Sequence, residues 1–204
     1  MCLASNVAVR DGNLVLTARH ESVGWAQYTT GAVNSRGQRS FAATAAGPVR
    51  VCVSGRLPGS PSTGAGLWPA FWLMPDDSSC WPDHGELDIM EMINGDGVTH
   101  ATYHVSTNAT HCTGQDKSET SEKRLTDWAD VDHEYAVEYG VDTFAFYVDG
   151  ELLHNASGKL PVHNVPWYVI LNFAVGGPWP HPPNASTVFP VETLVDYVRV
   201  SQAA

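Results

Sequence analysis

One short segment of the chain gathers acidic side chains at a spacing that suits chemistry. Between Glu86 and Glu91 the sequence reads E-L-D-I-M-E, so Glu86 and Asp88 alternate with apolar residues and share one face of a β-strand. Strict alternation would place Glu91 on the opposite face. A β-bulge, which adds one residue to the strand, restores the phase, and it predicts three carboxyl groups on one face.

An exposed strand with an acidic outer face would give the same alternation. The apolar segments on either side, 67–73 and 92–93, instead favour a central strand. Carboxyl groups packed close together raise at least one pKa, so one group keeps its proton near neutral pH while a neighbour is ionised. Retaining hydrolysis of glycosidic bonds needs such a pair, with the two carboxyl groups about 5 to 5.5 Å apart.

The composition limits the classes of partner. The 204 residues contain 11 Lys and Arg against 22 Asp and Glu, a net charge of -11, and no basic run, which argues against nucleic acid and against an anionic membrane surface. Apolar stretches stay far shorter than the roughly 20 residues of a membrane-spanning helix, and the first ten residues lack the layout of a signal peptide. We expect one domain over residues 1–204 and a monomer.

The elements that must hold the acidic strand are predicted to be other strands. Seven Trp, seven Tyr, 18 Gly and 13 Pro suit short strands joined by turns, and no segment has a sustained helical stripe. Segment 67–75 is mostly apolar and predicts a strand buried on both faces. The pattern indicates an all-β sandwich with strands at 13–18, 48–53, 67–75, 86–93, 99–106, 134–139, 143–148, 167–175 and 193–201.

The acidic motif resembles that of glycoside hydrolase family 16, in the bulged Glu-x-Asp-x-x-Glu form shared by laminarinases. The resemblance implies a jelly-roll β-sandwich, concanavalin A-like, with a concave substrate cleft. The chain looks short at its N-terminus beside family members, which implies that one or more N-terminal strands are lacking. Other segments that match in family order are Gly66–Pro75, Ala101–His104, Tyr135–Tyr139, Phe146–Gly150, Leu171–Gly177 and Val195–Val200.

By this resemblance Glu86 is the nucleophile, Glu91 is the acid/base, and Asp88 orients and tunes Glu86. The residues that match substrate-binding positions of the family are Trp72, Trp81, His104, Asn172 and Trp179. Taken alone, each tryptophan also fits a core position, and a histidine on a strand also fits a satisfied core residue.

Two structural sites are also expected. The resemblance places a calcium ion at Asp196 and the carbonyl group of Gly12, although Asp196 would equally suit a strand end; the chemistry itself needs no cofactor. Cys80 precedes the acidic strand and Cys112 follows the strand that carries His104, so adjacent antiparallel strands would bring them within reach of a disulfide. Four reduced thiols are the alternative, and Cys52 is expected to be a buried thiol.

The resemblance implies a retaining endo-glycoside hydrolase that cleaves β-1,3-glucan of the laminarin type, or mixed β-1,3-1,4-glucan, outside the cell. A related hydrolase acting on agar or carrageenan is an alternative, although the few basic residues disfavour a sulfated polymer. The alternative from a different class is a non-catalytic β-glucan recognition module. Modules of that kind typically lack the acidic triad, which is intact in this chain.

Overall fold

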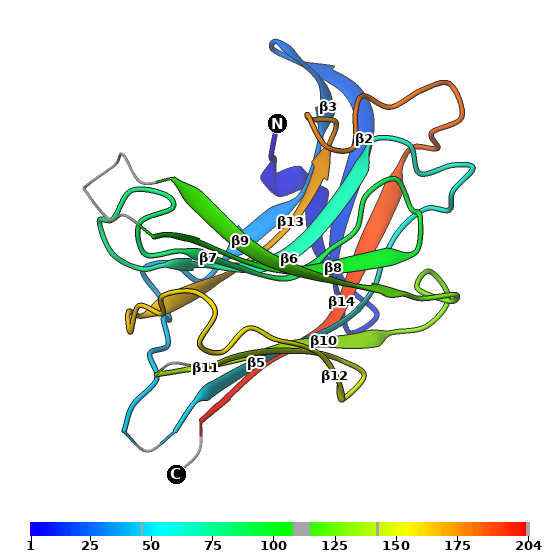
Figure 1. Ribbon diagram of the computed structural model, residues 1–204. Helices are drawn as coiled ribbons and strands as arrows, with labels where there is room; N and C mark the ends of the chain where they lie inside the picture. The colour runs from blue at the N-terminus through cyan, green and yellow to red at the C-terminus, as the bar shows by residue number, and fades with distance from the viewer. Residues whose placement is uncertain (46, 108–114, 142, 203–204) are drawn as a thin grey trace.

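Two antiparallel β-sheets packed face to face form the computed structural model of the protein, which describes residues 1–45, 47–107, 115–141 and 143–202 (Figure 1). The larger sheet has the order β1-β2-β14-β5-β10-β11-β12, with β3 paired to β2, and the smaller one has the order β4-β13-β6-β7-β8-β9. The strands of the larger sheet are β1 (Val7–Arg10), β2 (Asn13–Val23), β3 (Ala26–Thr29), β5 (Val49–Arg56), β10 (His133–Gly140), β11 (Thr143–Val148), β12 (Glu151–Asn155) and β14 (Val191–Gln202). Those of the smaller sheet are β4 (Ala32–Asn34), β6 (Leu67–Pro75), β7 (Glu86–Glu91), β8 (Val98–Ser106), β9 (Asp116–Arg124) and β13 (Trp167–Val175).

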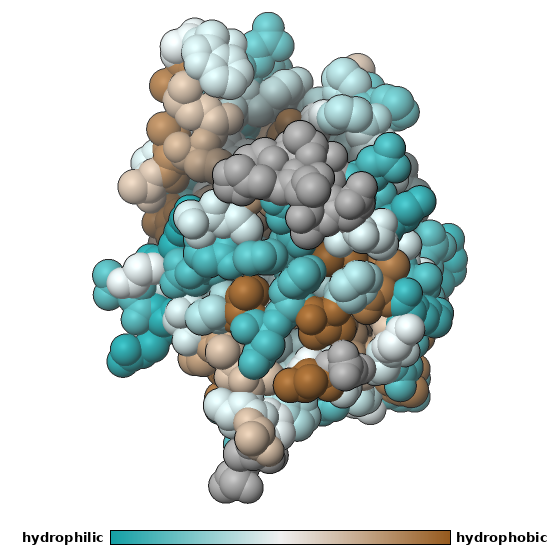
Figure 2. Space-filling model, turned by 60° about the vertical axis from the view of Figure 1, so that its left-hand side comes forward, coloured by the Kyte–Doolittle hydropathy of each residue, from teal (hydrophilic) through white to brown (hydrophobic). Residues whose placement is uncertain are grey.

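The predicted all-β sandwich is confirmed. A single turn of 3-10 helix, Ala4–Asn6, is the only helical element in the described part of the chain, so none of the described helices has the length and apolar character to cross a membrane. All nine predicted strands are present. Hydrophilic side chains cover most of the face seen in Figure 2, with hydrophobic ones in small groups, as expected for a chain with a net charge of -11.

The core lies between the two sheets and is filled mainly by alternate residues of β2, β5, β6, β8, β10, β11 and β13. Phe71 of β6 and Tyr135 of β10 are fully buried and meet edge to face, with ring centroids 6.0 Å apart. Tyr103 of β8 stacks on Phe144 of β11 at 4.3 Å. These contacts join strands of different sheets, so they fix one sheet relative to the other.

Segment 67–75 corrects one expectation. Leu67, Phe71 and Leu73 are completely buried, but Trp68 and Trp72 on the opposite face are only half-buried. The strand is therefore not buried on both faces. Its second face is apolar in sequence because it carries tryptophan rings at a solvent-accessible surface.

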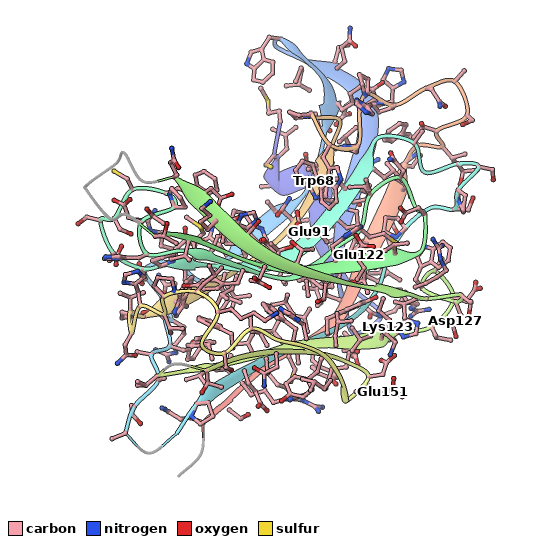
Figure 3. The ribbon with its side chains drawn as sticks, in the orientation of Figure 1. Trp68, Glu91, Glu122, Lys123, Asp127 and Glu151 are labelled. Carbon is pink, nitrogen blue, oxygen red and sulfur yellow. The ribbon has the colours of Figure 1, made fainter. Side chains whose placement is uncertain are left out.

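Five strands lie outside the nine predicted segments: β1, β3, β4, β9 and β12. The first three are only three or four residues long. Strand β9 is an edge strand with no apolar face, since its sequence is DKSETSEKR. Its Lys123 reaches the edge of the larger sheet and pairs with Glu151 of β12 at 2.9 Å, while Glu122 lies on the other side (Figure 3).

The predicted bulge is present in β7. Against β6, Asp88 pairs with Trp72 but Met90 pairs with Phe71, so Ile89 is an extra residue in that ladder. The pairing of β7 with β8 shifts between Asp88 and Glu91 as well. Because both ladders shift at the same place, the phase of the strand changes once and Glu91 returns to the face of Glu86 and Asp88.

Gly85 sets the entry into β7 and generates a prediction about stability. Its φ of +100° is unfavourable for other residues, and a Cβ atom would lie 2.8 Å from the carbonyl oxygen of His104 and 2.9 Å from the Tyr103 ring. Gly150 has a φ of +76° with nothing within 4 Å of the same position. A non-glycine residue at such angles costs about 1 to 3 kcal/mol, and Gly85→Ala adds a clash with backbone.

We therefore expect Gly85→Ala to lower the free energy of unfolding by about 2 kcal/mol more than Gly150→Ala, the matched control for backbone strain alone. Urea denaturation of the two variants measures the difference. Equal losses of unfolding free energy in the two variants would show that the atoms around Gly85 can shift to accept a methyl group without a loss of stability.

Candidate functional site

Three carboxyl groups occupy the outer face of β7, where two cavities adjoin. The larger, of about 450 Å³, and the smaller, of about 210 Å³, are both lined by Trp68, Glu86 and Glu91. Asp88 lines the smaller cavity. We call the two cavities together the cleft. Since β7 is central in the sheet, the cleft extends over the strands on either side of it.

Trp68 holds Glu91 in place. Residues 68, 70 and 72 of β6 share one face, and the indole Nε1 of Trp68 donates a hydrogen bond to Oε1 of Glu91 at 2.8 Å. Figure 3 shows the two side chains close together above the smaller sheet. Burial raises the pKa of Glu91, the hydrogen bond from Trp68 opposes that rise, and the nearby Glu86 carboxylate adds to it.

Glu86 lies at the other end of the acidic row, opposite His104 of β8. Burial raises the pKa of Glu86, while the charge of His104 and a hydrogen bond from Trp81 oppose the rise. The Trp81 ring is half exposed and lies 6.1 Å from the His104 ring. Glu86 therefore has two neighbours that favour its ionised form.

Asp88 is the most deeply buried of the three carboxyl groups, with 3% of its surface exposed. Its Oδ2 lies 3.4 Å from Nε2 of His104, in a geometry that makes no hydrogen bond with any described residue. Burial, together with the charges of Glu91 and Glu86, raises the pKa of Asp88 well above its ordinary value. Asp88 thus retains its proton most strongly within the row.

The remaining predicted binding residues surround this row. Nε1 of Trp72 donates to Oδ1 of Asn172 at 2.6 Å, and both side chains line the smaller cavity. Trp179 lines the larger cavity with His104, and its ring meets the Trp68 ring edge to face at 5.6 Å. The cleft therefore brings together Trp72, Asn172, His104 and Trp179, while Trp81 borders it through Glu86.

Sequence reasoning missed several residues of the site. Trp68 was detectable, because it shares the face of Trp72 four residues away. Asp116, whose Oδ2 lies 3.0 Å from Nδ1 of His104, gave no signal because nothing in the sequence pairs β9 with β8. His100 lies opposite Glu91 and packs against Trp179 with ring centroids 4.9 Å apart.

The predicted calcium ligands lie near each other in the larger sheet. Val195 pairs with Leu14, so Asp196 follows at the level of the turn that contains Gly12. Asp196 is exposed, and the pairing of β14 with β5 shifts beside it. Among the described residues, one group of three or more His, Cys, Asp or Glu side chains has metal-ligand spacing. Asp196 is not a member of that group. One carboxylate with backbone carbonyls fits only a weakly held calcium ion.

The cysteines are of two kinds. Cys80 is disulfide-bonded, whereas Cys2 and Cys52 are free. Cys52 is buried, as expected. Cys112 lies outside the described residues, so its pairing with Cys80 stays a prediction.

Comparisons with known proteins agree with this geometry. Residues 3–188 match the family described as Glycosyl hydrolases family 16. The chain belongs to that family. A beta-glucanase of Rhodothermus marinus is 32% identical over 96% of this chain and 70% of its own length. A glucan endo-1,3-beta-glucosidase A1 of Niallia circulans is 30% identical over 96% of this chain, which spans only 30% of that relative.

Solved structures are similar over nearly the whole chain. The laminarinase catalytic domain of Thermotoga maritima has a TM-score of 0.83 and 29% identity, covering 98% of this chain and 81% of that one. The laminarinase of Rhodothermus marinus has a TM-score of 0.80 and 29% identity, covering 97% of this chain and 80% of that one. The predictions of a family 16 glycoside hydrolase and of a laminarinase-like jelly-roll fold are confirmed.

The burial of Asp88 generates a prediction about stability and pH. Below the ordinary pKa of an aspartate, about 3.9, the group is protonated in both the folded and the unfolded chain. Above it, the unfolded chain releases the proton while the folded protein retains it, so Asp88 costs increasing stability as the pH rises. An asparagine at this position stays neutral throughout.

We expect Asp88→Asn to raise the melting temperature at pH 7 and to leave it almost unchanged at pH 3. Differential scanning calorimetry between these limits measures the change, with Asp130→Asn, at an exposed carboxylate, as the control. A pH-independent difference between wild type and Asp88→Asn would contradict the assignment of a retained proton to Asp88.

Proposed function

We propose that this protein is a retaining endo-glycoside hydrolase that cleaves β-1,3-glucan of the laminarin type or mixed β-1,3-1,4-glucan. The observation that carries the proposal is the row of three carboxyl groups on one face of β7, facing a cleft with tryptophan in its walls. The names of the relatives, a beta-glucanase and a glucan endo-1,3-beta-glucosidase, support the same substrate class.

In this mechanism Glu86 is the nucleophile. Its carboxylate attacks the anomeric carbon of the sugar, an ester bond forms to the enzyme, and the bond to the leaving oxygen breaks. The hydrogen bond from Trp81 and the charge of His104 favour the ionised form of Glu86 that this step needs. His104 is oriented by Asp116, 3.0 Å from its other ring nitrogen.

Glu91 is the acid/base. Burial raises the pKa of its carboxyl group, so a proton is held ready for the leaving oxygen. After departure of the leaving group, the Glu91 carboxylate takes a proton from water, the oxygen of which attacks the anomeric carbon and releases Glu86. Asp88 keeps its own proton and so adds no further negative charge between the two glutamates.

The side chains around the row suit a chain of neutral sugars. Flat indole surfaces at Trp72, Trp81 and Trp179 stack against the CH-rich faces of sugar rings, and Asn172 offers amide groups to hydroxyl groups. We infer that they bind successive sugar units on either side of the bond that is cleaved.

Release of reducing ends tests the proposed function. We expect soluble oligosaccharides and new reducing ends from laminarin, less from lichenan, and none from agarose. A product series in which intermediate lengths precede short ones would indicate endo-cleavage. Retention of laminarin without cleavage would indicate a recognition module. Cleavage of agarose alone would show that the substrate is agar and not β-glucan.

A second experiment tests the role of Glu86. Glu86→Ala removes the attacking oxygen, so the rate on laminarin falls by several orders of magnitude. Sodium azide then enters the vacated space and attacks from the same side, giving a glycosyl azide of inverted anomeric configuration. Nuclear magnetic resonance of the product identifies the anomer. A variant that keeps more than about a tenth of the wild-type rate would exclude this role.

We infer that the protein works outside the cell. The disulfide at Cys80 supports this compartment, because disulfides persist in oxidising surroundings. A peptide that joins Cys80 to Cys112 in a non-reducing digest is expected from protein made in an oxidising host.

We infer that a calcium ion at Asp196 and the carbonyl of Gly12 has a structural role only. It would tie β14 to the turn between β1 and β2 on the side of the molecule away from the cleft. An ion with so few protein ligands binds with a dissociation constant on the order of 10⁻⁴ to 10⁻³ M. Millimolar calcium is therefore expected to raise the melting temperature by a few degrees relative to EDTA. Asp196→Asn should abolish this difference, and an equal calcium effect in that variant would assign the ion elsewhere.

A further inference from the structure

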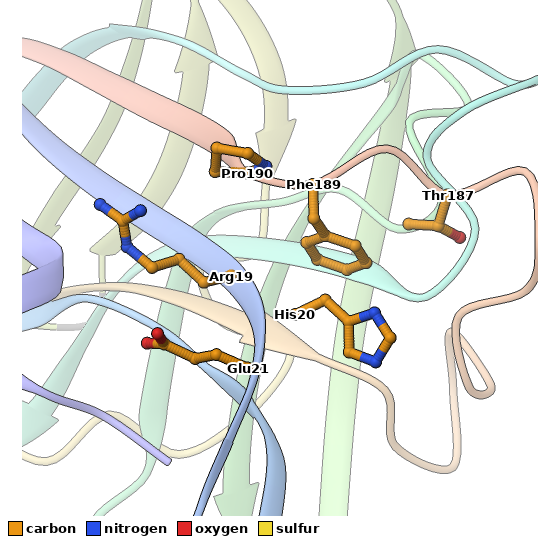
Figure 4. Close-up of a pocket in the computed structure, with 6 residues that line it drawn as sticks. All are labelled: Arg19, His20, Glu21, Thr187, Phe189 and Pro190. Atoms are coloured by element: carbon orange, nitrogen blue, oxygen red, sulfur yellow. The ribbon is translucent and has the colours of Figure 1, made fainter.

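A third cavity lies apart from the cleft, between β2 and the segment that leads into β14. It has a volume of about 430 Å³ and is lined by Arg19, His20, Glu21, Thr187, Phe189 and Pro190 (Figure 4). None of these residues lines the cleft. Small-molecule sites commonly measure about 300 to 1,000 Å³, so the space suits one or two sugar units. We call it the β2 pocket.

The sheet opens at this point because a ladder ends. Strand β14 pairs with β2 as far as Val191 and Ala18. Pro190 comes next and has no N–H to donate, so the ladder does not continue toward Phe189. On its other side β2 goes on pairing with β3, through Arg19 with Thr29 and His20 with Tyr28. One edge of β2 beyond Ala18 therefore faces the pocket instead of another strand.

Aromatic rings gather beside this open edge. His20 is exposed and stacks on Tyr28, with ring centroids 4.9 Å apart and planes 24° apart. Phe189 approaches the Tyr28 ring at 5.3 Å and the His20 ring at 6.1 Å. Three rings that support one another present a firm surface, on which a sugar ring can stack with little loss of side-chain freedom.

Two residues of opposite charge, Arg19 and Glu21, flank His20 along β2 and also line the pocket. Nε of Arg19 donates to Oδ1 of Asn6 at 2.9 Å, and Oε1 of Glu21 accepts a hydrogen bond from the Thr29 hydroxyl. Each contact orients a side chain and uses only part of its hydrogen-bonding capacity, since a guanidinium has five N–H groups and a carboxylate has two oxygens. Because one cationic and one anionic residue line the pocket, these two charges balance and give no preference for a charged ligand over a neutral, hydroxyl-rich one.

The β2 pocket and the cleft are linked by one segment, residues 176–190. This segment carries Trp179 in the cleft and Phe189 in the pocket. Between them the Thr187 hydroxyl donates to the carbonyl of Ala65 at 2.8 Å, and Val188 N donates to the carbonyl of Thr63 at 3.2 Å. The residues that receive these bonds lead directly into β6 and Trp68, so the pocket is held in a fixed relation to the cleft.

We propose that the β2 pocket is a second carbohydrate-binding site, which holds a sugar unit of a neutral β-glucan outside the residues that cleave it. The identity of the polymer rests on the proposed function. The site retains long chains near the cleft, and it contributes nothing to substrates that are too short to reach both places.

Two pocket variants and one control test the proposal. His20→Ala removes an exposed ring, Phe189→Ala removes its neighbour, and Val188→Ala changes an exposed apolar residue that does not line the pocket. Each is combined with Glu86→Gln, so that polymer survives, and is run through native gels containing increasing laminarin. We expect the dissociation constant from retardation to rise at least threefold for His20→Ala and Phe189→Ala, and to stay unchanged for Val188→Ala.

Kinetics with Glu86 intact supply the second measurement. His20→Ala is expected to lower kcat/KM on laminarin about threefold through KM, with no change on a β-1,3-linked tetrasaccharide. Phe189 also packs against the core, so thermal unfolding accompanies that variant, and His20→Ala decides the matter because its ring is exposed. Retardation of His20→Ala equal to that of Val188→Ala would overturn the second site.

Failure of the proposed function would look different. An unmutated protein that releases no reducing ends from laminarin would refute glucan hydrolysis before any pocket variant is made. A protein that cleaves laminarin and binds it equally well with and without His20 would refute only the second site.

Discussion

The single extra residue in β7 is the constraint on which the active face depends. A central strand cannot slip against one neighbour alone, and in this protein the ladders with β6 and with β8 shift at the same point. As a result Ile89 and Met90 are both buried although they are adjacent, while Glu91 turns outward. Regular alternation would bury Glu91 in the core, where an unpaired carboxylate is very costly. The bulge thus keeps Glu91 out of the core and also places it on the same face as Glu86 and Asp88.

Assembling that row works against the stability of the fold. Burial raises the pKa of Glu86, Asp88 and Glu91 together, which means that the folded protein disfavours their charged forms. The neighbours that oppose this rise act unequally on the two glutamates: Trp81 donates to Glu86 and Trp68 donates to Glu91, while the charge of His104 acts on both and more strongly on Glu86 than the Trp81 hydrogen bond does. Acid and nucleophile chemistry needs groups of similar type to differ in protonation, and these neighbours supply the difference.

Much of the fold can be predicted from local sequence, because a strand with one apolar face shows alternating apolar and polar residues. Strand β9 does not, since both of its faces are polar and only its pairing with β8 makes it a strand. The same limit applies to the site. The carboxyl groups of β7 are readable from six consecutive residues, whereas the contact between Asp116 and His104 depends on the register of β8 with β9. Trp68 lies between these cases: its face was readable, but its bond to Glu91 required the bulge.

Contacts made largely by backbone support the wall beside Glu91. Gly66 has a φ of +78°, and a Cβ atom there would lie 2.4 Å from the backbone nitrogen of Pro183, so the chain before β6 and segment 176–190 touch directly. The side chain of Asn94, just beyond β7, accepts the N–H of Gly66 at 2.7 Å, and its backbone N–H donates to the carbonyl of Leu67. The start of β6 and the end of β7 are thereby locked together, which fixes the separation of Trp68 and Glu91. Because this lock uses few side chains, the aromatic residues along the wall are free to match a sugar chain without supporting the fold.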